Sequence, residues 1–384
     1  MSKPLHILFT SSWFPSRVHP TLGNFVQRHA EAVASKHRVH VLYLAKQKGL
    51  KHSPEIEERE EHGVRITTVY YGRGVSKTWS RWKALQTGIR HLQATDQWHF
   101  DLVHHHVTWP EAWQLVVIRK RFRLPVVLTE HWTGYLREAR GKLAGRVIVL
   151  SRWASRFVSV FAPVTAHLGE HMRHYGMKGK YRVVPNVVDT SLFTVGKKAT
   201  DRVNFLHVSS LDDPHKNISG ILRAWKKASE QRSDIHLHIG GDGPWEAVRD
   251  AAMKLGIAPD RISFFGEQPW EVIADYMRDA HTLILFSNYE NLPCVIVEAL
   301  ASGMRIISSD VGGISEHIDD SRGTLIARKD EAGLAEAILK EADLAASADR
   351  QALRKYADAH FSMDAIAAQF DAIYREVMHP ARHT

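Results

Sequence analysis

The sequence predicts an α/β protein made of two domains, each with a parallel β-sheet, and three observations support this prediction. The chain has 384 residues, enough for two domains with separate cores. Strand-like runs alternate with helix-like segments through both halves, as in α/β units. The charge changes sign: residues 1–190 hold 29 lysines and arginines against 13 aspartates and glutamates, and residues 191–384 hold 22 against 29.

Runs rich in β-branched and aromatic residues predict the strands, and segments with apolar residues three or four positions apart predict the helices. In the first half, strands are expected at 5–10, 39–44, 64–70, 101–107, 125–131, 157–164 and 181–188, and helices at 24–36, 109–122 and 165–176. In the second half, strands are expected at 203–210, 235–241, 262–267, 282–287 and 305–311.

The domain boundaries follow from this alternation. We expect one Rossmann-like domain over residues 1–190, a polar linker near 189–201 and a second Rossmann-like domain over 202–355. An amphipathic helix is expected at 360–379. Two such domains facing each other across a cleft would bind ligands beyond the carboxyl ends of their strands.

The composition also predicts a cellular location. No segment approaches the roughly 20 apolar residues that span a bilayer, and the first residues, MSKPLHILFTSSWFP, have too short an apolar core for a secretory signal. The single cysteine, Cys294, excludes an intrachain disulfide and is expected to be a small packed residue rather than a nucleophile. We therefore expect a cytoplasmic protein.

The stretch SNYENLPCVIVEALASG (287–303) carries two glutamates, Glu290 and Glu298, across a proline. A buried strand precedes it and a helix follows, with Pro293 near the start of that helix, where a missing N–H costs little. Free amides at such a helix start attract phosphate. Carboxylates beside them suit the neutral hydroxyls of a sugar and a ribose, so the stretch predicts a sugar-nucleotide site.

Several motifs in order strengthen this prediction. VVPNVVDTSLF (183–193), LHIGGDGPWEAVRDAAMKLGI (237–257) and FFGEQPWEVIADYMRDA (264–280) precede the glutamate stretch, and DVGGISEHI follows it. From about residue 5 to 375 the chain resembles glycosyltransferase family 4, retaining nucleotide-sugar transferases with the GT-B fold. The resemblance implies a hexosyltransferase-type enzyme with an acceptor-side domain at 1–190 and a nucleotide-sugar-binding domain at 202–355. It also implies that the helix at 360–379 packs back on the first domain.

In this family the first glutamate, here Glu290, hydrogen-bonds the donor sugar, and the second, Glu298, accepts from the ribose diol. The amides of Asn291 and Leu292 would face the diphosphate. Lys216 matches the lysine that neutralises the diphosphate, whereas Ser210 stands where the family has an arginine; His207 or His215 is expected to compensate only weakly. Without the resemblance, both glutamates and Lys216 would be read as solvated surface charges.

The resemblance extends to two positions in the first half. Gly23, in SSWFPSRVHPTLGNFVQRHAEAV, matches a loop glycine that lets the backbone approach donor phosphate and acceptor; the alternative is a simple tight turn. His131, in PVVLTEHWTGYL, matches a histidine beside the donor sugar that contacts a hydroxyl rather than acting as a base; the alternative is a structural histidine. Together, the implied catalytic residues are His131, Lys216 and Glu290.

No cofactor or metal is expected. His104 and His106 share one strand face, but no carboxylate or cysteine at metal-ligand spacing accompanies them. The glycines of GGDGPWE (240–246) lack the third glycine of a dinucleotide fingerprint, because Glu246 occupies that position.

The first half has a net charge of +16, which predicts an anionic partner. SKTWSRWKALQTGIRHLQ (76–93) and VIRKRFRLP (117–125) concentrate basic and aromatic residues, and on a helix Trp79, Trp82 and Leu85 are expected to share one side. This pattern suits an anionic membrane surface, although a helix with solvated arginines would look the same. No recognition motif indicates nucleic acid.

The expected reaction is transfer of a sugar, with retention, from a UDP- or GDP-sugar to a glycan or lipid-linked acceptor, as in polysaccharide or lipopolysaccharide biosynthesis. Retention follows from the resemblance alone. The alternatives are a sugar-nucleotide epimerase on the same fold and, less favoured, a nucleic-acid-binding protein.

Overall fold

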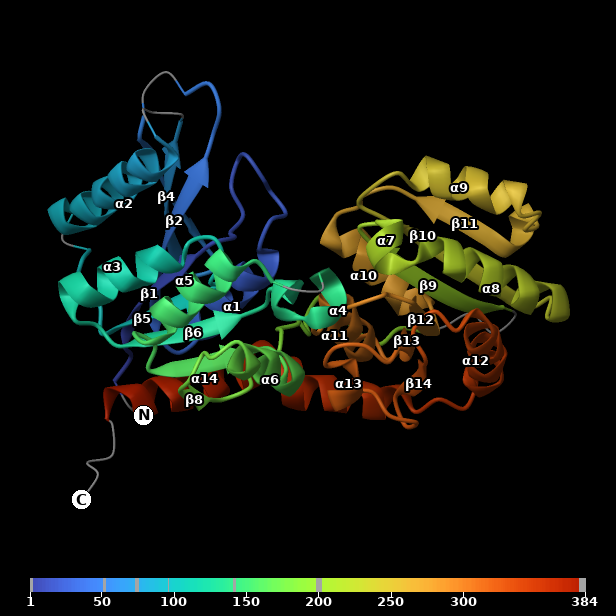
Figure 1. The fold of residues 1–384 in the computed structure, drawn as a ribbon. Coiled ribbons are helices and arrows are strands. Elements are labelled where there is room, and N and C mark those ends of the chain that lie inside the picture. The colour runs from blue at the N-terminus through green and yellow to red at the C-terminus, as the bar shows by residue number, and fades with distance from the viewer. Residues whose placement is uncertain are drawn as a thin grey trace. The chain divides into compact units, whose positions relative to one another are not determined.

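The computed structural model describes residues 3–50, 53–72, 76–95, 97–140, 143–197 and 202–379. The chain forms two compact units (Figure 1). Unit 1 contains Met1–Tyr135, Lys142–Val187 and Met363–Thr384, and unit 2 contains Leu136–Gly141 and Val188–Ser362. Of the expected linker at 189–201, residues 198–201 lie outside the described residues.

Unit 1 is built on an eight-stranded sheet in the order β3-β4-β2-β1-β5-β6-β7-β8. Its strands are β1 (His6–Ser11), β2 (Arg38–Lys46), β3 (Glu55–Glu61), β4 (Val64–Tyr71), β5 (Leu102–His106), β6 (Val126–Glu130), β7 (Val160–Pro163) and β8 (Lys180–Tyr181). All neighbouring pairs are parallel except β3 and β4. The sequence analysis missed β3, because its acid-rich sequence EIEEREE suits an exposed edge strand rather than a buried one.

The helices of unit 1 cover both faces of this sheet. Helices α1 (Asn24–Ala34) and α14 (Met363–Met378) contact each other and share one core cluster, whereas α2 (Lys77–Ala94), α3 (Ala112–Phe122) and α5 (Gly145–Ser155) line the other (Figure 1). Consecutive residues of β1 enter different clusters, Leu8 one and Phe9 the other, because side chains alternate along a strand. Helix α6 (Ala166–His174) follows β7.

Unit 2 is built on a six-stranded sheet in the order β11-β10-β9-β12-β13-β14, and all its neighbouring pairs are parallel. The strands are β9 (Val203–Ser209), β10 (Ile235–Gly241), β11 (Ile262–Phe265), β12 (Thr282–Leu285), β13 (Arg305–Ser309) and β14 (Gly323–Ile326). The helices are α4 (Arg137–Arg140), α7 (Asp213–Lys216), α8 (Ile218–Gln231), α9 (Trp245–Lys254), α10 (Trp270–Asp279), α11 (Cys294–Ala301), α12 (Glu331–Leu344) and α13 (Arg350–Phe361).

This strand order is the one found in doubly wound dinucleotide-binding folds, and it reverses direction between β9 and β12. The equivalent reversal in unit 1 lies between β1 and β5. Ligands of such sheets bind at the carboxyl ends of the strands beside the reversal. The fold therefore directs attention to the loops after β9 and β12 in unit 2, and after β1, β5 and β6 in unit 1.

No helix within the described part of the chain is both long enough and apolar enough to span a membrane.

Candidate functional site

In unit 2, the loops after β9 and β12 bring two predicted site residues into contact. Strand β9 leads into α7, which ends at Lys216, and β12 leads into the loop that carries Glu290. The Lys216 Nζ atom lies 2.5 Å from the Glu290 Oε1 atom, and the two side chains are only 12% and 7% exposed. An ion pair thus stands at the strand ends where a ligand is expected to bind.

His215 holds the Glu290 loop against α7. Its ring stacks on Tyr289 with 4.1 Å between centroids, and its Nε2 atom lies 2.9 Å from the Tyr289 carbonyl oxygen and 3.5 Å from Glu290 Oε1. The Asn288 amide donates to the His215 carbonyl at 2.7 Å. Burial and the nearby Lys216 lower the pKa of His215, so its ring is neutral near pH 7.

The remaining predicted residues of unit 2 lie at the start of α11. Asn291 and Leu292 are 5% and 3% exposed, and Glu298 is completely buried on the helix itself. Pro293 occupies the N-cap position and makes no capping hydrogen bond through its own side chain. Glu290 is also buried, so neither glutamate is a solvated surface charge. The donor-binding roles of these residues stay predictions.

A second loop supports the Glu290 backbone from behind. Gly312 has a φ of +61°, and a Cβ atom placed there would lie 1.8 Å from the Glu290 carbonyl oxygen. The Gly313 amide donates to the Asn291 carbonyl at 3.1 Å. The glycine pair of the DVGG motif therefore lets two backbones approach more closely than any side chain would allow.

Ser210 is exposed, and the structure separates the two histidines that were expected to compensate for the absent arginine. His207 is fully buried, and its ring nitrogens contact the Ile284 carbonyl oxygen at 2.9 Å and Ser209 Oγ at 2.7 Å. Both nitrogens are thus occupied, and burial lowers the pKa of His207 to about 4. Only His215 lies beside Glu290.

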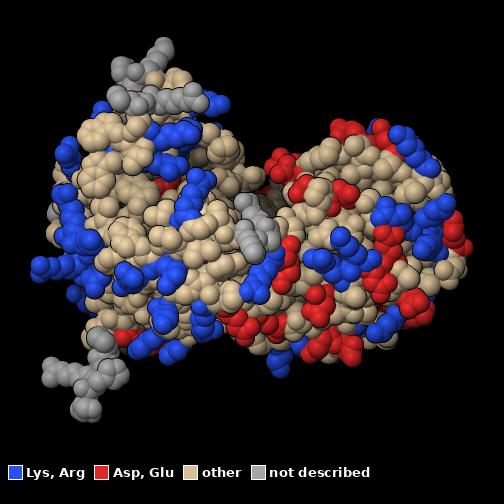
Figure 2. All heavy atoms as spheres, in the orientation of Figure 1, with Lys and Arg blue, Asp and Glu red and all other residues tan. Residues whose placement is uncertain are grey.

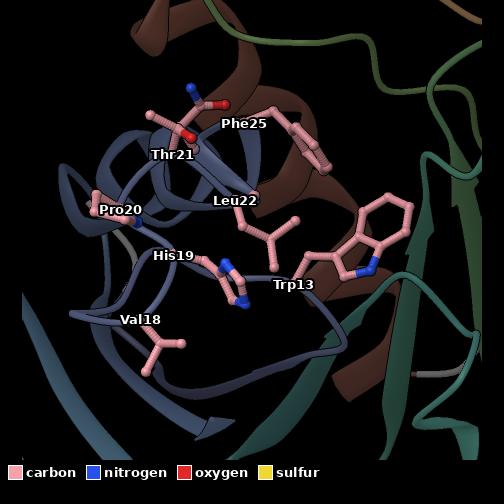
Figure 3. A pocket seen from close by; sticks show the side chains of 9 residues that line it. Trp13, Val18, His19, Pro20, Thr21, Leu22 and Phe25 are labelled. Carbon is pink, nitrogen blue, oxygen red and sulfur yellow. The ribbon is translucent and has the colours of Figure 1, made fainter. Parts of the chain in front are cut away.

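In unit 1, the loop after β1 forms a pocket of about 510 Å³ (Figure 3). Its lining includes Trp13, Val18, His19, Pro20, Thr21, Leu22, Gly23, Asn24 and Phe25. Gly23 precedes α1 with a φ of +75°, and a Cβ atom there would lie 2.6 Å from the Trp13 carbonyl group. The glycine therefore allows the end of the loop to fold onto its beginning.

His131 lies next to this pocket. The ring of Phe25, a pocket residue, packs on the His131 ring with 4.4 Å between centroids. His131 Nε2 lies 3.3 Å from His106 Nδ1, and burial holds the pKa of both rings well below the ordinary value. His131 is therefore neutral, a state in which it can hydrogen-bond a hydroxyl. Its contact with a sugar stays a prediction.

Glu130, which the sequence analysis did not single out, fixes the backbone of His131. Its Oε1 atom accepts from the amides of His131 at 2.9 Å and Trp132 at 3.0 Å, and Oε2 accepts from the Thr108 amide at 3.0 Å and hydroxyl at 2.5 Å. The carboxyl is fully buried, which raises its pKa, while the four donors oppose that shift. Glu130 thus ties the end of β6 to the end of β5.

The histidines considered as metal ligands separate into two groups. His104 hydrogen-bonds the Tyr374 hydroxyl and Thr129 Oγ1, both at 2.7 Å, so its two nitrogens are occupied. His106 instead lies with His29 and His131, and the candidate ligand atoms of these three buried imidazoles are all within 4.8 Å of one another. The His29 Nε2–H group donates to the Pro185 carbonyl oxygen, 3.0 Å away. The expectation that no metal is needed stays a prediction.

The glycines of GGDGPWE serve backbone packing in unit 2. Gly241 and Gly243 both have a φ of +128°, and Cβ atoms there would lie 2.1 Å from the Ser209 carbonyl oxygen and 2.4 Å from that of Ser210. The β10–α9 loop therefore rests on the chain that leads from β9 to Lys216.

Comparisons with known proteins agree with this fold. Residues 190–360 match the family described as "Glycosyl transferases group 1", and residues 22–192 match "Glycosyltransferase Family 4". Glycogen synthase of Mycobacterium tuberculosis (strain CDC 1551 / Oshkosh) is 24% identical over 297 residues, which cover 74% of this chain and 71% of that protein.

Two solved structures show the same architecture. Sucrose-phosphate synthase from Thermosynechococcus elongatus superimposes with a TM-score of 0.77 at 20% identity, covering 98% of this chain and all of that one. Anabaena HepE, solved in complex with UDP and glucose, superimposes with a TM-score of 0.70 at 16% identity, covering 97% of this chain and all of that one. The chain therefore belongs to glycosyltransferase family 4 and has the GT-B fold.

Proposed function

We propose that this glycosyltransferase moves a hexose from a UDP- or GDP-sugar to a hydroxyl of a glycan or lipid-linked acceptor, with retention, in bacterial surface polysaccharide or glycolipid synthesis. The observation that carries the proposal is the Lys216–Glu290 ion pair at the β9–β12 reversal, close in sequence to the start of α11. The UDP complex of HepE supports a uridine donor. The proposed location is the cytoplasm, at the inner face of the plasma membrane.

In the proposed donor site, different residues bind the diphosphate, the sugar and the ribose of the nucleotide sugar. The diphosphate contacts the Lys216 ammonium and the amides of Asn291 and Leu292, because a cation and aligned N–H groups stabilise negative charge. Glu290 accepts from hydroxyls of the sugar, and Glu298 accepts from the ribose. Glu290 already contacts Lys216, so one carboxylate holds the cation in place and faces the sugar.

The proposed chemistry is a front-side displacement. The bond from the anomeric carbon to the diphosphate oxygen breaks, and the acceptor oxygen attacks from the same face. The acceptor proton passes to the departing phosphate, whose growing charge Lys216 stabilises. His131 contributes a neutral hydrogen bond to the sugar. This scheme requires neither a covalent intermediate nor a metal ion.

The pocket after β1 is the proposed acceptor site. Trp13, Leu22 and Phe25 give it an apolar lining, and the Trp13 and Phe25 rings meet edge to face with 6.2 Å between centroids. Aromatic rings of this kind pack against the apolar face of a sugar or the chain of a lipid carrier. The glycogen synthase relative supports a glycan acceptor, and the basic first half supports a lipid-linked one.

Donor binding is tested by thermal shift with UDP-, GDP- and ADP-sugars, since a ligand that binds only the native state raises the melting temperature.

Glu290→Gln is expected to abolish transfer while the melting temperature of the free protein changes little, because the amide oxygen still accepts from Lys216. Lys216→Ala should lower kcat by about a hundredfold. Lys226→Ala, which removes an exposed partner of Glu230 on α8, is the control.

Full transfer by Glu290→Gln would remove that residue from the site. Incubation with a sugar nucleotide and no acceptor distinguishes a transferase from a sugar-nucleotide epimerase. An altered sugar that is still attached to its nucleotide would show an epimerase.

A further inference from the structure

The layer of α2, α3 and α5 on unit 1 contains no acidic residue. The three helices span 40 residues and carry nine lysines and arginines but no aspartate or glutamate. The basic residues are Lys77, Arg81, Lys83, Arg90, Arg119, Lys120, Arg121, Arg146 and Arg152. Figure 2 shows lysine and arginine side chains spread among uncharged atoms over this part of the molecule. Such a surface attracts a dense array of negative charges.

The three helices form one continuous surface. Helices α2 and α3 meet where the Trp82 and Trp113 rings lie 6.5 Å apart and Arg121 donates to Gln86 at 3.2 Å. Helix α3 in turn contacts α5. We name this surface the basic helix face and define it by α2, α3 and α5.

Large apolar side chains project from this face into solvent. Trp79 and Trp82 on α2 are 58% and 39% exposed, and Val149, Leu150 and Trp153 on α5 are 64%, 43% and 37% exposed. Leu85, expected on the side of the two tryptophans, is instead buried in the core and lies about 120° around the helix from Trp79. Leaving such side chains in water is unfavourable unless a partner covers them.

Helix α5 did not contribute to the sequence-based expectation of membrane contact. Its sequence GRVIVLSRWAS is apolar enough to suggest a core helix, but its buried residues are Val147, Ser151, Ala154 and Ser155. The larger residues of this helix therefore face outwards. The exposed apolar residues of α5 thus add a second apolar stripe to the one on α2.

We propose that the basic helix face docks on an anionic lipid surface, with the side chains of Trp79, Val149, Leu150 and Trp153 entering the headgroup region. Lysine and arginine surrounding exposed tryptophan and aliphatic residues is the composition of interfacial helices on anionic membranes. This inference rests on the proposed function because that proposal places the enzyme at the inner face of the plasma membrane. Nucleic acid, the other large polyanion, would not need the aliphatic side chains of α5.

The test is co-sedimentation of the full chain with vesicles of phosphatidylcholine, with and without phosphatidylglycerol, at low and high salt. Retention is expected only on the vesicles with phosphatidylglycerol, and salt should weaken it because screening shortens the range of the attraction. The triple variant Lys77→Glu/Lys83→Glu/Arg146→Glu should lower the partition coefficient by at least about tenfold.

A second variant separates insertion from charge attraction. Trp79→Ser/Val149→Ser/Leu150→Ser keeps every cation, so it should retain binding at low salt and lose the part that survives high salt. Met253→Ser/Lys254→Glu is the matched control, because it changes an exposed apolar residue and an exposed lysine on α9 of unit 2. This control should bind as the wild type does.

Thermal shifts with UDP-sugar in vesicle-free solution keep the two proposals apart. Variants of the basic helix face should bind donor normally, so loss of donor binding in the wild type would count against the proposed function alone. Equal retention by neutral and anionic vesicles, or normal retention of both triple variants, would overturn the docking proposal. Salt-sensitive binding to duplex DNA without vesicle binding would replace it with a nucleic-acid surface.

Discussion

Single residues determine how the proposed catalytic groups are held. Glu290 was predicted as a site residue from the strand, loop and helix start around it, and Lys216 from the family resemblance; the structure places their charged atoms 2.5 Å apart. Glu130 was not found, although it immediately precedes His131. The sequence shows a carboxylate at a strand end, but the four donors that converge on it come from Thr108, His131 and Trp132. Only the tertiary fold brings them together.

Glu130→Gln is expected to lower both stability and turnover. The carboxylate of Glu130 accepts hydrogen bonds with both oxygens, whereas glutamine has one oxygen and one N–H₂ group that can only donate. Some of the buried amide N–H donors therefore lose their acceptor, which lowers the free energy of unfolding by about 1–3 kcal/mol. Because those amides belong to His131 and Trp132, kcat should fall more than the donor KM rises. Steady-state kinetics and urea unfolding measure the two effects.

Glu341→Gln is the matched control for Glu130→Gln, since Glu341 is also fully buried but accepts from Arg305 and Thr324, away from the strand ends of the proposed site. It should lose stability and keep its kcat. Should Glu130→Gln also keep its kcat, the carboxylate would have only a structural role.

The buried histidine His29 predicts a pH dependence of stability. Burial lowers its pKa to about 4 in the folded protein, whereas the unfolded chain has the ordinary value of 6.5. Between these values the unfolded state binds more protons, so the free energy of unfolding falls as the pH is lowered from 6.5 to 4. His29 alone contributes about 3 kcal/mol to that decrease. Urea titrations at several pH values should show a shallower slope for His29→Phe than for the wild type, and identical slopes would contradict the assignment.

At the level of elements, parallel pairing of the buried strands could be predicted from the sequence, and the antiparallel edge strand could not. Alternating strands and helices predicted parallel sheets, and the buried strands of both units follow that pattern. The antiparallel β3 has no buried face to give it an apolar signature. The expected strand at 181–188 shrinks to β8 (Lys180–Tyr181), although the amides of Arg182 and Val184 still donate to the Phe161 and Pro163 carbonyls of β7 before the chain leaves unit 1.

The loop between β1 and α1 gives a test of how a pocket depends on one glycine. Gly23→Ala adds a Cβ atom 2.6 Å from the Trp13 backbone and also strains a φ of +75°. Gly63→Ala has the same φ of +75° but open space around the added atom, so it carries only the backbone cost of about 1 kcal/mol. Gly23→Ala should therefore raise the acceptor KM, whereas Gly63→Ala should not. Equal acceptor KM values would show that the pocket shape does not depend on Gly23.

At the level of the whole molecule, the chain leaves unit 1 after Val187 and returns at Met363. Helix α14 then packs on α1, and its residues Ile366, Phe370 and Tyr374 are completely buried in the unit 1 core. The amphipathic pattern of 360–379 predicted a helix, and the family resemblance suggested its partner. Unit 1 is thus assembled from segments at both ends of the chain.

Deleting the residues after Ser362 is expected to unfold unit 1. Removing three fully buried large side chains forfeits about 1.5–3 kcal/mol each, a large part of the stability of a typical domain. Circular dichroism melting should show loss of the transition that belongs to unit 1. Truncation after His379, which leaves α14 intact, is the control. A truncated chain that melts like the full one would show that α14 is dispensable.

The return of α14 has a consequence for synthesis of the protein on the ribosome. The apolar stripe of α1 that α14 covers, including Val26, Ala30 and Val33, leaves the exit tunnel early, and its cover is translated last. Until α14 has been synthesised, these apolar side chains of α1 are exposed on the nascent chain. Chaperones bind exposed apolar segments of this kind. Co-expression of a chaperone should therefore raise the yield of soluble recombinant protein without changing the melting temperature of the folded protein.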